Sequence, residues 1–407
     1  MTLGSILYKG MPMKSPQHNN YSFAICLVTS LFFMWALGSS INGILIKHFR
    51  DTMHLSRFEA GFVDTAFYLG YFIMAIPAGI VNRKIGYKGG ILVGLILFAV
   101  GSFLFYPASG VGTYSFFLLA LWIIASGLTF LENCGCSYIA RLGDPQFAER
   151  RLNLAQSFNG LGLVLTVYFG GHLIFSNPGN VYVVFLIIGS IAAVLALIFL
   201  FTKLPPIQDK TDSIKIDFTV ITKYPHLRYG VLGIFFYLGA QASIWGYFLY
   251  IVNEKVPSMP DVQANNYYSL CFLVFMLGRF FSTFFMRYVK PTKLLAIYAF
   301  INIVLLVLTQ AFPHMIGVYA LIAVNFFMSA MYPTIFSLSI REVGQDTKIA
   351  ASFLVMAIIG GAIFPPLLGL VADIFGNILY GLVIPILCFA YIGFFAIHGH
   401  VIRKIII

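Results

Sequence analysis

Residues 181–202 read VYVVFLIIGSIAAVLALIFLFT, a run without one charged side chain. A helix needs about 20 apolar residues to cross a bilayer core of about 30 Å. The run therefore predicts a membrane-spanning helix, and the fold depends on how often such a run recurs.

Eleven further apolar stretches of similar length occur along the chain. We place them at 22–46, 60–82, 89–107, 115–140, 152–175, 229–252, 265–287, 294–311, 317–340, 350–374 and 378–399. The 407 residues are 60% hydrophobic and only 10% charged, which excludes a soluble domain and a disordered chain. We predict an all-α membrane protein with twelve transmembrane helices in two bundles of six.

The basic residues orient this arrangement. With residues 1–21 in the cytoplasm, 20 of the 25 Lys and Arg fall on the cytoplasmic side, four on the other side, and Arg279 inside a span. This asymmetry satisfies the positive-inside rule. It predicts a multi-pass protein of the cytoplasmic membrane with both termini inside, and the net charge of +11 needs no nucleic-acid partner.

The longest polar connection divides the chain into two halves. It covers 203–228 and contains Pro205-Pro206 with charges of both signs. We predict an N-terminal bundle at 1–202, a cytoplasmic linker at 203–228 and a C-terminal bundle at 229–407. Two such bundles are typical of transporters whose substrate site lies at mid-membrane between the halves.

Glu132 is the foremost candidate for chemistry inside the membrane. It lies deep in the predicted fourth span, with no basic residue within two helical turns. An ionisable residue at such a place is a functional candidate by default. A carboxyl in apolar surroundings can hold a proton and release it when water arrives, as proton coupling requires, although a neutral acid bonded to a neighbouring helix is the structural alternative.

Three other charged residues lie in or near predicted spans. Asp64 fits either a helix-start role near the outer face or a functional one. For Asp373, near the outer end of the eleventh span, we expect an interfacial role. Arg279 suits a cytoplasmic gate, together with Arg83 and Lys84 of the basic loop after the second span, or a side chain that extends toward the headgroups.

Neutral polar side chains within the spans suit a sugar ligand, because amides offer donors and acceptors to hydroxyl groups. Taken singly, each amide is more often a contact between helices. The candidate sugar ligands are Asn42, Asn133, Gln156, Asn159, Gln241, Trp245 and Tyr332.

Glycine and proline predict breaks in two spans. Gly360-Gly361 and Pro365-Pro366 lie in the eleventh span, and Tyr332-Pro333 lies in the tenth. Proline removes a backbone hydrogen bond, and such breaks persist where other groups satisfy the freed carbonyl. They indicate either hinges or simple curvature.

No enzyme signature is present. The sequence has no phosphate-binding loop and no HExxH zinc motif, and its five cysteines indicate neither a disulfide scaffold nor a metal site. We therefore expect no catalytic residue, no metal and no cofactor other than a coupling ion, with protons as the expected ion.

Several stretches resemble the fucose–galactose–glucose symporter family of the major facilitator superfamily. The resemblance covers nearly the whole chain and rests on 31–36, 66–72, 76–79, 151–159, 239–245, 332–338, 344–348 and 358–361. It implies a sugar transporter that works by alternating access, with the superfamily's habit of acting as a monomer. Glu132 then matches the family's proton-coupling glutamate, Gln156 and Asn159 its fifth-span amides, and Tyr332 its tyrosine before proline.

One position departs from the family. Where members carry an acid in an Asn-Asp-Ile-Leu context, this chain reads Asn42-Gly43-Ile-Leu45. The lost acid leaves substrate and coupling open, and Asp64 is a hypothetical replacement. We predict proton-coupled import of a hexose or 6-deoxyhexose, with fucose first. The alternatives are a facilitator, a sodium-coupled glucose or galactose carrier, and an exporter of the same superfamily.

Overall fold

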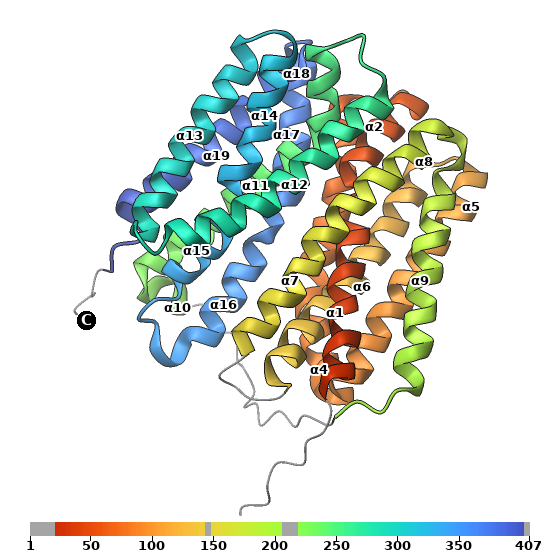
Figure 1. Cartoon of the computed structure of the whole chain (residues 1–407), viewed down its shortest axis with the longest axis vertical. Helices are drawn as coiled ribbons and strands as arrows, with labels where there is room; N and C mark the ends of the chain where they lie inside the picture. The colour runs from red at the N-terminus through yellow and green to blue at the C-terminus, as the bar shows by residue number, and fades with distance from the viewer. Residues whose placement is uncertain (1–20, 143–147, 206–218, 403–407) are drawn as a thin grey trace, which may run out of the picture.

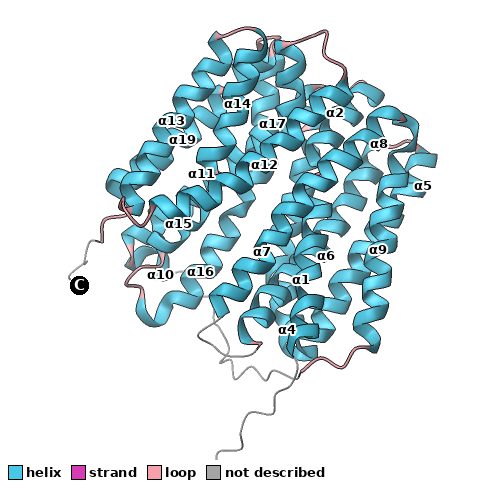
Figure 2. Ribbon diagram, in the orientation of Figure 1, coloured by secondary structure: helices cyan, strands magenta, loops and turns pink. Residues whose placement is uncertain are grey.

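The computed structural model describes residues 21–142, 148–205 and 219–402. These ranges are built of helices and connecting turns, as Figures 1 and 2 show. Twelve of the helical segments are long and apolar enough to cross a membrane. The predicted all-helical, twelve-span fold is therefore confirmed.

The helices of the first half pack mainly with one another, and so do those of the second; we call these groups the N-terminal and C-terminal bundles. The first contains α1 (Tyr21–Ser39), α2 (Asn42–Met53), α3 (Arg57–Ala60), α4 (Phe62–Phe103), α5 (Phe105–Val111), α6 (Tyr114–Arg141), α7 (Ala148–Leu165), the π-helical η2 (Thr166–Gly170), α8 (Gly171–Ser176), η3 (Pro178–Asn180) and α9 (Val181–Phe201). The second contains α10 (Thr219–Lys223), α11 (Pro225–Lys255), α12 (Asp261–Phe285), α13 (Pro291–Ala311), α14 (His314–Met328), α15 (Met331–Ser339), η4 (Gly344–Asp346), α16 (Thr347–Met356), η5 (Ala357–Ile359), α17 (Gly360–Ile374), α18 (Ile378–Gly381), α19 (Val383–Phe394) and the π-helical η6 (Phe395–Gly399).

The first span is longer than predicted and is broken. α1 ends at Ser39, α2 begins at Asn42, and the apolar segment continues to Met53. Lys47, which we expected in a loop, is therefore a helical residue with only 5% exposure. Its ammonium reaches Asp51 at 2.8 Å and Asp261 at 3.4 Å, and this pairing makes its burial tolerable.

The break in the tenth span lies slightly earlier than Tyr332-Pro333. α14 ends at Met328 and α15 starts at Met331, so Pro333 falls in the first turn of the new helix, where its missing N–H is not needed. In the eleventh span the short helix η5 precedes Gly360, and α17 then runs through both prolines.

Hydrogen bonds and ion pairs between described residues of the two bundles gather in one half of the molecule. This half, uppermost in Figure 1, lies opposite the start of α1, and we call it the closed half. Its bonds join Arg57 and Phe58 to Asp373, Thr65 to Ala362, Tyr247 to Arg57, Tyr250 to Lys47 and Asp51, Lys47 to Asp261, and Asn265 to Val167.

Candidate functional site

Glu132 lies on α6 and is exposed, although it sits among side chains of other helices. Its Oε2 accepts a hydrogen bond of 3.2 Å from Nε1 of Trp35 on α1. It is also close enough to Tyr71 of α4 and Tyr332 of α15 to interact electrostatically with both phenols. Because Tyr332 belongs to the other bundle, Glu132 faces the space between the bundles and not the lipid side.

Tyr332 belongs to an aromatic group on the C-terminal bundle. Its ring centroid lies 6.0 Å from that of Tyr237 and 6.1 Å from that of Phe336. Tyr237 donates its hydroxyl to the carbonyl of Met328 at 3.2 Å, where α14 ends. The carbonyl at the helix break thus has a side-chain partner, and Tyr237 lies beside Tyr332, the tyrosine within electrostatic reach of Glu132.

Asp64 and Asn42 form a buried pair inside the closed half. Asn42 donates Nδ2 to Asp64 Oδ1 at 2.8 Å, and Asp64 is 3% exposed. The second carboxyl oxygen, Oδ2, has no hydrogen-bond partner among the described residues, and a methyl group at Gly246 of α11 would come within 2.7 Å of it. The carboxyl therefore lies against the opposite bundle.

The titratable groups around Asp64 are tyrosines. Tyr68 of α4, Tyr114 of α6, Tyr247 of α11 and Tyr268 of α12 all lie within electrostatic reach of it. No cation within the described ranges forms an ion pair with it. A buried carboxyl without a cation is strongly disfavoured as an anion.

Gly43 lies at the contact between α2 and the C-terminal bundle. A Cβ at this position would clash with the carbonyl oxygen of Trp245 and with the hydroxyl of Tyr268. The glycine therefore lets α2 approach α11 and α12 closely in the closed half. An acidic side chain does not fit here in this conformation.

Several predicted sugar ligands already have partners in this state. Asn159 donates Nδ2 to the carbonyl of Phe32 at 3.1 Å, which joins α7 to α1. Trp245 donates Nε1 to Asn325 Oδ1 at 2.8 Å, and its ring packs 4.7 Å from that of Phe272. These contacts hold helices of one bundle together.

The other predicted residues are not brought into one cluster. Asn133 on α6 is half-buried, and Gln241 on α11 is buried with 8% exposure. Arg279 on α12 is half-buried and places its guanidinium 5.1 Å from the Phe275 ring centroid, and its Nε has no hydrogen-bond partner in the described part of the chain. Lys84 is exposed. The side chains of Gln156 and Arg83 lie outside the described residues.

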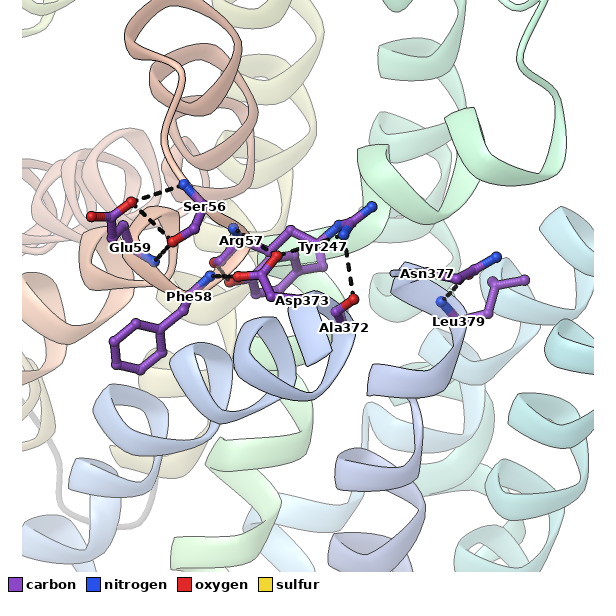
Figure 3. A network of polar contacts seen from close by, with 9 residues as sticks. All are labelled: Ser56, Arg57, Phe58, Glu59, Tyr247, Ala372, Asp373, Asn377 and Leu379. Carbon is purple, nitrogen blue, oxygen red and sulfur yellow. Dashed lines mark hydrogen bonds and ion pairs between the residues drawn. The ribbon is translucent and has the colours of Figure 1, made fainter. Parts of the chain in front are cut away.

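The outer end of the closed half carries a polar network drawn in Figure 3. Asp373 of α17 accepts hydrogen bonds from the backbone N–H groups of Arg57 at 3.2 Å and Phe58 at 2.9 Å. The Arg57 guanidinium lies 3.5 Å from the same carboxylate and donates to the carbonyl of Ala372 at 3.3 Å. Asp373, for which we expected an interfacial role at the outer end of its span, contacts the opposite bundle.

A pocket of about 300 Å³ opens beside this network. Its walls include Lys47, Arg50 and Asp51 from α2, together with Tyr250 and Glu254 from α11. It combines charges of both signs at the mouth of the closed half and is separate from Glu132.

Sequence reasoning did not single out Trp35, Tyr71 or Thr65 as site residues. Trp35 carried a usable signal, since a buried indole N–H normally requires an acceptor. Thr65 donates Oγ1 to the carbonyl of Ala362 at 2.7 Å. Pro366 has no N–H for that carbonyl, so a partner for Ala362 was needed, but its identity depends on how the bundles meet.

Comparison with known proteins identifies the fold and its relatives. The model of the Major Facilitator Superfamily matches residues 27–358. The L-fucose-proton symporter of Escherichia coli K12 is 38% identical over 96% of both chains. A glucose/galactose transporter of Brucella abortus biovar 1 is 35% identical over 96% of this chain and 98% of its own.

Solved structures agree. The transporter FucP in its outward conformation is 38% identical, covers 92% of this chain and 98% of its own, and superposes with a TM-score of 0.68. The nucleoside transporter NupG, in a D323A mutant, superposes over the same shares with a TM-score of 0.73 at 15% identity, a likeness of fold alone.

Proposed function

Because this chain belongs to the Major Facilitator Superfamily and, within it, to the fucose–galactose–glucose symporter family, we propose that it imports a hexose or 6-deoxyhexose together with protons. It is a multi-pass sugar transporter of that family and not an enzyme. The relatives named above transport fucose in one case and glucose or galactose in the other. An L-fucose-like sugar is the first candidate.

The observation that supports proton coupling is the position of Glu132. Its carboxyl is exposed to the space between the bundles and accepts a hydrogen bond from Trp35, and Tyr332 lies within electrostatic reach across that space. A carboxyl that faces the substrate space and is also held by hydrogen-bond partners can couple its proton to sugar binding. Protonation and sugar binding then favour the same state.

The closed half is the extracellular half in this proposal. The positive-inside asymmetry puts the start of α1 in the cytoplasm, and the closed half lies at the opposite end. The structure then corresponds to an inward-facing state of an alternating-access cycle. We propose that Arg83, Lys84 and Arg279 belong to a cytoplasmic gate, which an inward-facing state would open.

In this state the sugar has fewer free ligands than the sequence predicts. Asn133, Gln241 and Tyr332 are the proposed contacts that have no competing side-chain hydrogen bond among the described residues. Asn42, Asn159 and Trp245 donate to protein partners here. We propose that they, with Gln156, contact sugar when the bundles rearrange.

Uptake into right-side-out vesicles tests the proposal. Glu132→Gln should abolish uphill accumulation driven by a proton gradient and retain counterflow exchange, because the amide binds sugar but carries no proton. Glu342→Gln, at an exposed acid in the loop after α15, is the matched control and should behave as wild type. Full proton-driven accumulation by Glu132→Gln would refute the coupling role.

Gly43 leaves two competing functions, because an acid that could carry a proton is missing at this position. They are a sodium-coupled sugar carrier and a facilitator that couples no ion. The same vesicles separate the possibilities when fucose, galactose and glucose are each offered with a proton gradient, with a sodium gradient, and with neither. Accumulation above the external concentration with a sodium gradient alone would indicate a sodium-coupled carrier. Uptake that never exceeds the external concentration under any gradient would indicate a facilitator. Either result would replace the proton symporter.

A further inference from the structure

We propose that Asp373 acts as a latch that holds the closed half shut, by capping the start of a helix in the opposite bundle. This role rests on the proposed alternating-access function and assigns a positioning residue to its cycle. The latch consists of Asp373 on α17 and the backbone N–H groups of Arg57 and Phe58 on α3 (Figure 3).

The backbone N–H donors at the start of α3 need an acceptor from outside their own bundle. Ser56 is the N-cap: its hydroxyl accepts from the Glu59 N–H, and the Glu59 carboxylate accepts from the Ser56 N–H. This exchange leaves the N–H groups of Arg57 and Phe58 without a partner inside their own bundle. The first N–H groups of any helix are orphans of this kind.

Asp373 supplies both missing acceptors from across the interface. One carboxyl oxygen takes the Arg57 N–H at 3.2 Å and the other takes the Phe58 N–H at 2.9 Å. α3 continues through Gly61 into α4 as one apolar span from Arg57 to Asn82, so the carboxylate caps a full transmembrane helix. Carboxylates are favoured at such a helix start by charge as well as by hydrogen bonding.

The backbone, and not the Arg57 side chain, is the main partner. The guanidinium Nη1 is 3.5 Å from Asp373 Oδ1, longer than either backbone bond, and it also serves the Ala372 carbonyl. On the same residue, the Arg57 carbonyl accepts the hydroxyl of Tyr247 from α11. The chain at Arg57 is therefore held on both sides by the C-terminal bundle.

Close packing of backbone against backbone makes this geometry specific to the closed half. A Cβ on Gly369 of α17 would clash with the Arg57 carbonyl, and one on Gly61 would come within 2.8 Å of Pro366. Separation of the bundles at this end must withdraw Asp373 from both N–H groups together. Loss of the latch should therefore raise the population that is open at this end.

Distances between spin labels placed on the two bundles, at the outer end of the closed half, test the latch. Labels at Thr52→Cys on α2 and Ser258→Cys after α11 occupy exposed positions on the two bundles, in a chain whose five native cysteines are replaced by alanine. Pulsed electron resonance on purified protein, without sugar or gradient, gives the ratio of long to short distances. The reading does not depend on which solute is carried, so it stands apart from the transport assays.

We expect Asp373→Ala and the isosteric Asp373→Asn to raise the open-to-closed ratio about tenfold, because the closed state loses charge-assisted hydrogen bonds. Arg57→Gln keeps the backbone donors and should change the ratio by less than about twofold. Glu254→Gln is the matched control, because Glu254 bonds Asn377 within its own bundle.

Three results would overturn the latch. They are an unchanged ratio in both Asp373 variants, an effect of Arg57→Gln as large as that of Asp373→Ala, and an equal effect of Glu254→Gln. The second result would assign closure to the ion pair, and the third to surface charge in general.

Discussion

Asn42 holds Asp64 through a 2.8 Å hydrogen bond between two neighbouring helices of one bundle, one residue before Gly43, where the family resemblance predicts an acid. The pair places a carboxyl one helix away from that position, at the contact with the C-terminal bundle. Asp64 is 3% exposed and forms no ion pair with any described residue, and burial without a counter-charge favours the neutral form of a carboxyl. Opening of this half would expose the carboxyl to water, where the charged form is stable.

We therefore predict that Asp64→Asn reduces proton-driven sugar accumulation at least tenfold, on the order of 1.4 kcal/mol or more of coupling, and preserves counterflow. The amide cannot exchange a proton at any physiological pH. The measurement is uptake in vesicles with an imposed pH gradient, beside counterflow in the same preparation.

Exchange of the two residues provides the control. In Asn42→Asp/Asp64→Asn the acid moves to α2, and the hydrogen-bonded pair is kept. We expect partial recovery of accumulation, since the acid stays in the same buried contact. Normal proton-driven accumulation in Asp64→Asn alone would remove Asp64 from the coupling mechanism.

Trp35→Phe should weaken sugar binding more than turnover. The change removes the indole N–H that positions the Glu132 carboxylate and preserves most of the ring. A hydrogen bond to a charged group contributes about 1.5–3 kcal/mol, so we expect KM to rise roughly tenfold or more while the maximal rate changes little. Initial rates over a range of sugar concentrations measure both constants.

Trp245→Phe is the comparison for Trp35→Phe. Its N–H bonds Asn325 inside the C-terminal bundle, and phenylalanine keeps an aromatic face for the proposed sugar contact, so this change should lower the melting temperature and raise the KM much less than Trp35→Phe does. An unchanged KM in Trp35→Phe, with the KM raised only in Trp245→Phe, would show that the indole at Glu132 has no part in binding.

The sequence predicted the spans, a break in the tenth and eleventh of them and the acid Glu132 inside the fourth, because each follows from local pattern; it did not predict that the first span breaks between Ser39 and Asn42. Apolar length decides a span, a proline decides where a backbone bond is missing, and an unpaired acid in a span stands out without any knowledge of the fold. The prediction erred at Lys47, whose helix continues because two aspartates, one of them on α12, make its burial tolerable.

The partners across the bundle interface were beyond the reach of sequence. No residue pattern near Asp373 indicates that it caps α3, because Arg57 at the start of α3 lies 316 residues away along the chain. Amides were likewise ambiguous: Asn159 bonds a carbonyl of α1, whereas Asn42 holds an acid, and both read alike as polar residues in a span. Such roles depend on which faces meet in a given conformation.

Gly43→Asp, which introduces the acid that the family resemblance predicts at this position, should not improve proton-coupled uptake. In the closed half the new side chain clashes with the Trp245 carbonyl and the Tyr268 hydroxyl. Overpacking typically costs about 1–3 kcal/mol, so we expect the closed population to fall roughly five- to 150-fold. The spin-label pair at Thr52 and Ser258 reports that population, and uptake should fall with it.

Gly43→Ala separates volume from charge at this position. The methyl group alone meets the same two atoms, so it should reproduce most of the shift. If Gly43→Ala and Gly43→Asp both leave the distance distribution unchanged, the close approach of α2 to α11 does not limit closure.

Pro366 explains why the Ala362 carbonyl is free to accept the hydrogen bond from Thr65. In a regular helix the Ala362 carbonyl accepts from the N–H four residues later, and Pro366 has none, so the carbonyl takes the Thr65 hydroxyl from the other bundle instead. Thr65→Val removes the hydroxyl at constant shape and leaves a buried carbonyl unsatisfied, at a cost of about 1–3 kcal/mol to the closed state.

In a Pro366→Ala background the helix can satisfy Ala362 itself, so the same Thr65→Val change should cost less than about 0.5 kcal/mol. The four proteins of this double-mutant cycle are compared by the ratio of open to closed distances. Equal effects of Thr65→Val in both backgrounds would mean that the proline does not create the acceptor, and that Thr65 acts by packing alone.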